Sequence, residues 1–136
     1  MVLTAKLHIE GHEMYGEGIA LLSCSYAFIQ DVDLKGRPSS DVKGGTIAMS
    51  FYSIDDSDIM QWMISSFKGK NGNISFSAEE EDGKAFKTLE FKDAFCISYK
   101  EAFVRDGQMV TEIIISSRTI TVSDTTHSNH WPGYDN

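Results

Sequence analysis

Residues 88–99 read TLEFKDAFCISY, and apolar and polar side chains alternate along most of this segment. Side chains two residues apart lie on one face of a β-strand, so this period predicts a strand with two chemically different faces. Asp93 interrupts the apolar series, which indicates a β-bulge or a position at the edge of a sheet. The apolar series is Leu89, Phe91, Phe95, Ile97 and Tyr99, and the other series is Thr88, Glu90, Lys92, Cys96 and Ser98.

The same period recurs on both sides of this segment and predicts a mainly β protein. In the last long segment, 110–122, Ile113 and Ile115 are expected on one face of a strand and Ile120 on the other. Segment 19–29 is apolar at most positions, which is typical of a central strand whose two faces are both covered. Shorter alternating segments are 5–9, 46–52 and 74–78.

Residues 53–67, SIDDSDIMQWMISSF, carry a helical pattern. Acidic residues and Ser57 suit the start of a helix, so we expect a helix over about residues 57–67. Its apolar stripe should dock on the sheet, with Trp62 at the edge of the stripe. The stripe is Ile59, Met60, Met63, Ile64 and Phe67. These elements predict one domain, residues 1–136, built as a small β-barrel or two-sheet sandwich with one α-helix.

The composition narrows the classes of partner. The chain has 136 residues and a formal net charge of −8, which disfavours nucleic acid because phosphate contacts need clustered Lys and Arg. No apolar run reaches the roughly 18 residues of a membrane span, so we expect no membrane insertion. The first residues lack the apolar block of a signal peptide, which predicts folding in the cytoplasm. Cys24 and Cys96 lie in strand-like runs and are expected to be buried thiols.

The chemical motifs favour structural roles. His127 and His130 form an HxxH pair in a tail without cysteine, where a surface or interface role is favoured over metal binding. The acidic run 79–82 lacks the spacing of a calcium loop and is typical of a solvated hairpin tip. No GxSxG or P-loop is present. We therefore expect no catalytic residue, no metal ligand and no cofactor.

Two segments interrupt the strand pattern. Residues 34–45, LKGRPSSDVKGG, combine glycine, proline and serine, and they belong to an extended loop that we place at 32–45. Most connections between strands have two to five residues, so a loop of this length is expected to be functional. The tail, residues 124–136, has no strand period and is expected to be a surface segment held by Trp131.

The order of several motifs identifies a family resemblance. Residues 21–45, LLSCSYAFIQDVDLKGRPSSDVKGG, resemble the Hcp family, the TssD tube proteins of bacterial type VI secretion, and are most similar to its Bacteroidetes branch. The resemblance extends from about Ala5 to Trp131, and segment 12–18 departs from it by appearing longer than the first hairpin of the family. Further matching residues are Trp62-Met63, Ser66-Phe67, Gly72-Asn73-Ile74, Ala94, Tyr99, Glu101, Phe103, Ser116-Ser117 and the His127–Trp131 stretch.

The resemblance implies a β-barrel subunit that forms hexameric rings. Rings would stack into a tube that a contracting sheath drives outward with its spike and effectors, so sheath, spike, baseplate and effector proteins are the implied partners. The protein would assemble in the cytoplasm and leave through the type VI apparatus. In such rings the extended loop reaches neighbouring subunits, which makes Arg37, Pro38, Ser39, Ser40, Asp41 and Lys43 candidate interface residues. A lumen must stay wet, so Thr88, Glu90, Lys92 and Ser98 are candidates for the face that lines it.

Three other functions are compatible with the strand pattern. One is a stand-alone β-barrel that binds a small ligand or peptide, and a second is a secreted chaperone specific for one effector. The third is an enzyme, which requires a cleft with perturbed titratable groups.

Overall fold

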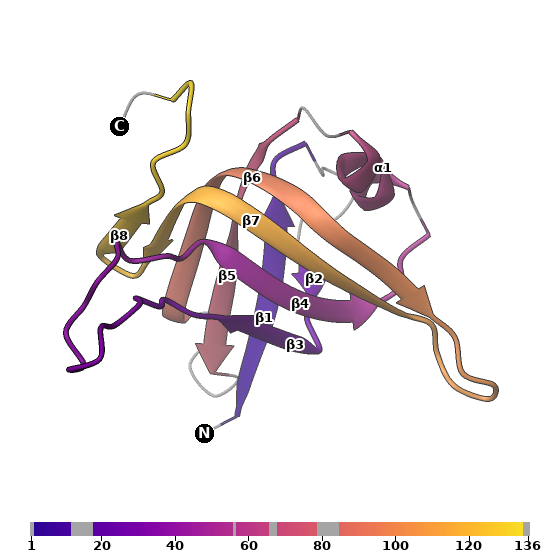
Figure 1. The fold of residues 1–136 in the computed structure, drawn as a ribbon. Coiled ribbons are helices and arrows are strands. Elements are labelled where there is room, and N and C mark those ends of the chain that lie inside the picture. The colour runs from indigo at the N-terminus through magenta and orange to yellow at the C-terminus, as the bar shows by residue number, and fades with distance from the viewer. Residues whose placement is uncertain (1, 12–17, 56, 66–67, 79–84, 135–136) are drawn as a thin grey trace.

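Figure 1 shows a computed structural model of the protein, which describes residues 2–11, 18–55, 57–65, 68–78 and 85–134. Within these residues the chain forms eight strands and one helix. In chain order they are β1 Leu3–Ile9, β2 Ile19–Ala20, β3 Ser23–Tyr26, β4 Thr46–Tyr52, α1 Asp58–Ile64, β5 Lys70–Ala78, β6 Ala85–Ala102, β7 Val110–Val122 and β8 Thr125–Ser128.

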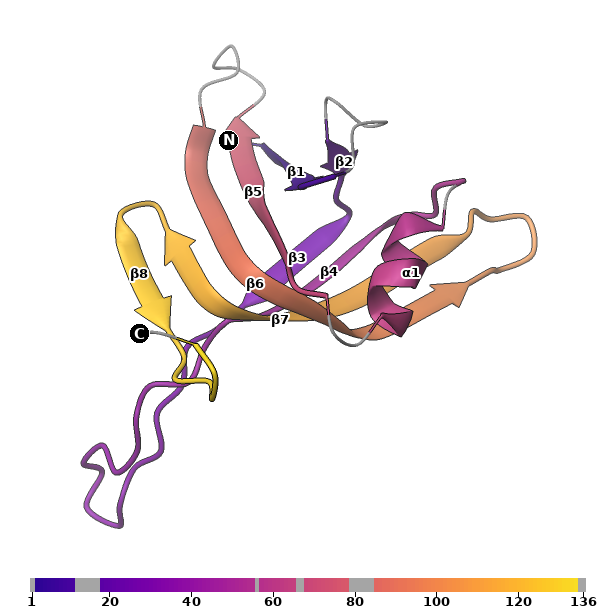
Figure 2. The same cartoon turned by 90° about the horizontal axis from the view of Figure 1, so that it is seen from above.

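The strands form one antiparallel sheet in the order β2-β1-β5-β6-β7-β4-β3, with β8 paired to β7. Figure 2 shows that the sheet curls strongly, with α1 beside β6 on the inner side of the curl. The buried side chains of the sheet and helix form one hydrophobic cluster. The fold is therefore mainly β, a curled half-barrel with one short helix, as the sequence predicts.

Residues 19–26 connect the two ends of the sheet. The Leu21 amide donates to the Ala5 carbonyl at 2.9 Å, and the next amide, Leu22, donates to the Ser50 carbonyl at 2.8 Å. The segment after β2 thus changes its hydrogen-bonding partner from β1 to β4 between two consecutive residues. The prediction of a central strand over residues 19–29 is wrong, because this apolar segment supplies the short strands β2 and β3 at the two ends of the sheet.

The two longest strands, β6 and β7, bend together beside Asp93. Asp93 has a positive φ of 52°, and the register between β5 and β6 shifts there, so the predicted bulge is confirmed. Its carboxylate accepts from Arg118 Nε on β7 at 2.9 Å. At the bend, consecutive buried positions are three residues apart instead of two: Phe91 and Ala94 on β6, and Ser117 and Ile120 on β7.

The bend reverses the alternation on β6 as far as Ile97, where a second register shift, between Cys96 and Ser98, restores it. The predicted apolar face continues through Phe95, Ile97 and Tyr99, but the structure buries Ala94 and Cys96 and leaves Ile97 52% exposed. On β7, Ile120 enters the same core as Ile113 and Ile115 instead of facing away from them. The predictions for Phe95, Ile97 and Ile120 are wrong because three residues, rather than two, separate the core positions at the bend, whereas Tyr99 packs against the core as predicted.

Helix α1 packs on the sheet through Ile59 and Trp62, which are each 3% exposed. The indole Nε1 of Trp62 donates to the Ala94 carbonyl at 3.1 Å, at the bend of β6. Met60 and Ile64 are exposed, so the predicted stripe is displaced and Trp62 lies at its centre instead of its edge. Phe67, the last residue of the predicted stripe, lies outside the described residues.

The tail contains a strand that the sequence pattern did not predict. β8 pairs with β7 from Thr125 opposite Val122 to Ser128 opposite Thr119. Beyond β8, the Trp131 ring lies 6.0 Å from Phe95 and 5.9 Å from Tyr134, centroid to centroid. The prediction that Trp131 holds the tail is therefore confirmed, whereas the prediction of a tail without a strand is wrong.

Replacing Trp62 by Phe should lower the free energy of unfolding by about 1–3 kcal/mol, because the Ala94 carbonyl loses its indole donor in a buried position. Urea unfolding followed by far-UV circular dichroism measures this change. The control is Ile64→Ala on the exposed side of the same helix, for which a change within about 0.5 kcal/mol is expected. Equal losses in the two variants would contradict the structural role of the indole N–H.

Candidate assembly surfaces

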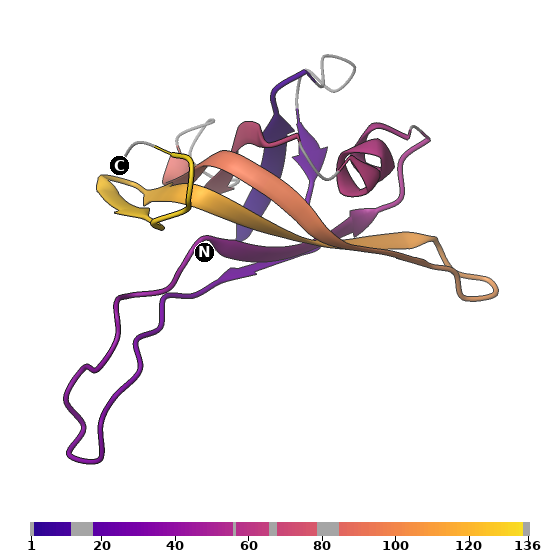
Figure 3. The same ribbon diagram turned by 45° about the horizontal axis from the view of Figure 1, so that its top comes forward.

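Residues 27–45, which we call the arm, project from the sheet between β3 and β4. Figure 3 shows the arm as a long purple hairpin that extends well beyond the sheet. Its two legs are joined by isolated bridges between Ile29 and Lys43 and between Val32 and Pro38. The predicted loop is thus the outer part of a narrow ribbon whose backbone is partly paired with itself.

The tip of the arm is ordered by Asp33. Its backbone amide donates to the Arg37 carbonyl at 2.8 Å, and its carboxylate accepts from the amides of Lys35 and Arg37 at 2.8 and 3.0 Å. These hydrogen bonds, that from the Arg37 amide first, lower the pKa of Asp33 below its usual value. The tip is therefore a turn stabilised by its own side chain.

The polar residues predicted for the interface make contacts inside the arm. Arg37 pairs with Asp33 at 3.2 Å, and Lys43 pairs with Asp31 at 3.1 Å. The Ser40 hydroxyl accepts from the Asp31 amide at 2.9 Å. The remaining candidates, Pro38, Ser39 and Asp41, are exposed on the second leg.

Apolar side chains on the arm were missed by sequence reasoning. Leu34 at the tip is fully exposed, and the others are between 40% and 65% exposed. A signal was present, because Val32 and Leu34 occupy alternate positions in the segment assigned to a polar loop, and Phe28 and Ile29 belong to the apolar segment 19–29 just before it. The exposed apolar residues of the arm are Phe28, Ile29, Val32, Leu34 and Val42.

A second projection, residues 102–110, joins β6 to β7 and extends from the opposite end of the molecule (Figure 1). We call it the distal hairpin. Its turn places Asp106 at a φ of 64°, and the Gly107 amide donates to the Val104 carbonyl at 2.9 Å. Phe103 and Val104 are 67% and 70% exposed, so this projection also carries apolar surface.

The four residues predicted to line a lumen lie on β6. Glu90 and Lys92 alternate with buried Leu89 and Phe91, and both point away from the core. Their neighbours on β7 are Thr121 and Thr119. Thr88 lies two residues before Glu90 and therefore faces the same way. Ser98, beyond the bend, pairs with half-buried Ile114 of β7. All four residues therefore lie on the side of the sheet away from the core.

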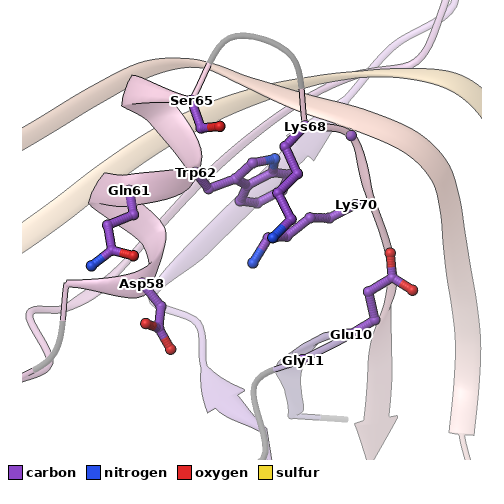
Figure 4. Close-up of a pocket in the computed structure, with 9 residues that line it drawn as sticks. Glu10, Gly11, Asp58, Gln61, Trp62, Ser65, Lys68 and Lys70 are labelled. Atoms are coloured by element: carbon purple, nitrogen blue, oxygen red, sulfur yellow. The ribbon is translucent and has the colours of Figure 1, made fainter.

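A pocket with a volume of about 570 Å³ lies between α1, the end of β1 and the start of β5 (Figure 4). Two of its charged residues, Glu10 and Lys70, have structural partners. Glu10 accepts from the Asn71 amide at 2.9 Å, and Lys70 Nζ lies 5.9 Å from the centre of the Trp62 ring. Most of the wall is exposed and of mixed charge, so the pocket is an open groove.

The side chains that could bind a metal ion lie apart from one another in the part of the chain that the structure describes. No group of three or more His, Cys, Asp and Glu residues there could hold a metal ion. His127 instead lies against Phe28, with ring centroids 5.7 Å apart, and shares a hydrogen bond with Asn129. Among the same residues, no helix is long and apolar enough to cross a membrane.

Both cysteines are free thiols. Cys96 is buried, and this burial raises its pKa to about 11. Burial also raises the pKa of the half-buried Cys24 thiol. Since the thiolate is the reactive form, both side chains are weak nucleophiles near neutral pH.

The sequence model of the family described as "Hemolysin coregulated protein Hcp (TssD)" matches residues 1–132. The chain belongs to the Hcp family. Hcp proteins are tube proteins of type VI secretion systems, a structural rather than an enzymatic family, and they are secreted by these systems. The resemblance found in the sequence is therefore confirmed over nearly the whole chain.

Solved Hcp structures share the fold. Hcp1 from Flavobacterium johnsoniae is 26% identical, with a TM-score of 0.83 over 93% of this chain and 99% of that chain. Hcp1 from Salmonella typhimurium is 14% identical, with a TM-score of 0.68 over 93% of this chain and 92% of that chain. Secreted protein Hcp3 from Pseudomonas aeruginosa is 13% identical, with a TM-score of 0.63 over 97% and 100%. A comparison with curated protein sequences gives no match.

Proposed function

We propose that this chain is the structural subunit of a type VI inner tube, in which hexameric rings stack end to end. Sheath contraction would then propel the tube and deliver its spike and effectors. The family match over residues 1–132 carries this proposal. The two apolar projections support it, because they lie at opposite ends of the molecule, as a repeated head-to-tail contact requires.

In the proposed assembly the arm supplies contacts to neighbouring subunits. Its apolar residues lose water on contact, and Leu34 at the tip has the largest exposed fraction among them. Arg37, Ser39, Ser40, Asp41 and Lys43 form a polar rim, and Pro38 stiffens the second leg. The hydrogen bonds around Asp33 order the tip before contact, which reduces the conformational entropy lost on assembly.

The polar side of β6 is proposed to line the lumen. Glu90 and Lys92 carry opposite charges on exposed positions, and threonine residues of β7 lie beside them. Such a surface remains hydrated and has little apolar area for a passing protein to adhere to. Thr88 extends this surface beyond Glu90, and Ser98 lies on the same side of the sheet but is separated from Lys92 by Phe95 and the exposed Ile97.

The proposed partners are further copies of the chain and the sheath, spike, baseplate and effector proteins of the apparatus. The tube would assemble in the cytoplasm and be exported by the machine itself. The formal charge of −8 makes free subunits repel one another, which opposes their nonspecific aggregation.

Purified protein should contain rings with a central hole in negative-stain electron microscopy and particles of six subunits in light scattering. Six-fold class averages are the expected result, because the family forms tubes and the fold carries two apolar projections. A monomer at every concentration tested, with a small ligand retained in native mass spectrometry, would instead favour a stand-alone binding module and overturn the proposal.

Leu34→Asp should raise the protein concentration needed for ring or tube formation at least tenfold. The reason is that burying one leucine stabilises a contact by about 1.5–3 kcal/mol, and the contact is repeated at each subunit. Sedimentation velocity measures the threshold, and unchanged thermal unfolding shows that the subunit remains folded. Lys35→Ala at the neighbouring position is the matched control. Assembly of Leu34→Asp at the wild-type concentration would exclude the tip from the interface.

A cysteine introduced as Glu90→Cys should be shielded from a bulky maleimide–polymer reagent in intact tubes and label rapidly in dissociated subunits. The native thiols give a low background at pH 7, because their pKa values are raised and Cys96 is buried. Gel-shift analysis of labelling with time gives the two rates. Equal rates in tubes and in subunits would place this side of β6 outside the lumen.

A further inference from the structure

The arm meets the sheet next to the C-terminal segment that follows β8. Asn129 lies at this junction, where its side-chain Nδ2 donates to the carbonyls of Gly44 at 2.8 Å and Ser117 at 3.1 Å. Its backbone amide donates to the Arg118 carbonyl at 2.8 Å. One side chain therefore ties the second leg of the arm to the centre of β7.

The first leg of the arm is held at the same place. The Phe28 ring packs edge-to-face against His127, with centroids 5.7 Å apart, and His127 Nε2 shares a hydrogen bond of 3.0 Å with Asn129 Oδ1. Phe28 also covers Gly44 so closely that a Cβ there would lie 2.4 Å from its Cδ1 atom. The two legs, His127 of β8 and Asn129 just after it are thus packed into one cluster.

The second leg enters β4 through a turn that depends on Gly45. Its φ is +92°, and a Cβ at this position would lie 2.4 Å from the Ser117 carbonyl oxygen. The Gly45 carbonyl accepts from both the amide and the hydroxyl of Ser117, at 2.8 and 2.9 Å. Ser117 is completely buried, so the base of the arm is anchored in the core of the sheet.

Beyond this junction the direction of the arm depends on its base. The residues between Ile29 and Lys43 are mostly exposed, and their hydrogen bonds join one leg of the arm to the other. An extended leg from Ile29 to Gly36 is about 20 Å long, so a tilt of about 20° at the base moves the tip by roughly 7 Å. That displacement exceeds the range of a van der Waals contact.

We propose that Phe28, Gly44, His127 and Asn129 form an arm clamp that sets the direction in which the arm leaves the sheet. Its role rests on the proposed function, since a correctly directed arm is what a neighbouring subunit would meet. The clamp acts by positioning: Asn129 orders the arm before assembly, and the ring contacts are made by other residues. The tail thereby controls assembly through the arm, to which Asn129 is bonded at Gly44, 85 residues earlier in the chain.

The test uses the full-length chain with Asn129→Ala. Two measurements are compared with wild type: ¹⁵N order parameters of amides 30–42 in dilute subunits, and the threshold concentration for assembly by sedimentation velocity. The clamp predicts lower order parameters across the arm and a threshold raised about tenfold, with circular dichroism unchanged. Thr126→Val is the matched control, because it removes the Thr121–Thr126 hydroxyl contact of the same hairpin and should change neither measurement.

Gly44→Ala provides a second variant from the arm side, because its methyl group overlaps the Phe28 ring and approaches His127 Cδ2 at 3.2 Å, while the Asn129 side chain is retained. It should give the same two changes even if Asn129→Ala were to unfold. An arm that stays ordered in a folded Asn129→Ala or Gly44→Ala variant overturns the clamp, and so does a disordered arm with wild-type assembly. Failure of the wild-type chain to form rings would overturn the proposed function separately, while the order parameters still test the clamp.

Discussion

The structure depends on the shared bend of β6 and β7, where the Asp93 carboxylate pairs with Arg118 at 2.9 Å. A single sheet can surround one core only if its long strands curl, and here both strands shift their buried positions at the same place. The ion pair connects the two strands at that point, and Asp93 is of a residue type that adopts the left-handed backbone region more readily than most. The bend also places the Ala94 carbonyl where Trp62 donates to it, which couples the helix to the curl.

The assembly surfaces follow from the same bend. Ser117 and Arg118 are adjacent, so the base of the arm and the start of the tail meet beside the ion pair. Phe95 lies on the side away from the core and receives Trp131, which holds the tail there. The apolar surface is thus divided: one part fills the curl, and another part is displayed on projections that a single subunit leaves exposed. That division is physically consistent with a subunit whose stable form is a larger assembly.

Much of the fold could be predicted because local patterns survive in it. Alternation identified most strands, the helical spacing located α1, and the interruption at Asp93 identified the bulge. The errors arose where tertiary contacts override local pattern. Residues 19–29 are apolar at both odd and even positions because the segment passes between the two ends of one sheet. β8 has no apolar alternation because its threonine and serine side chains are largely exposed.

The sequence by itself determined the class of fold, the family and the position of the arm, since these depend on the period, order and spacing of residues along the chain. Only the tertiary structure decided which side chains face the core beyond the bend, because the bulge at Asp93 reverses the alternation and a second register shift between Cys96 and Ser98 restores it. It also decided that Arg37 and Lys43 pair within the arm, and that Asn129 holds its base. These contacts join residues distant in sequence, and no local period encodes them.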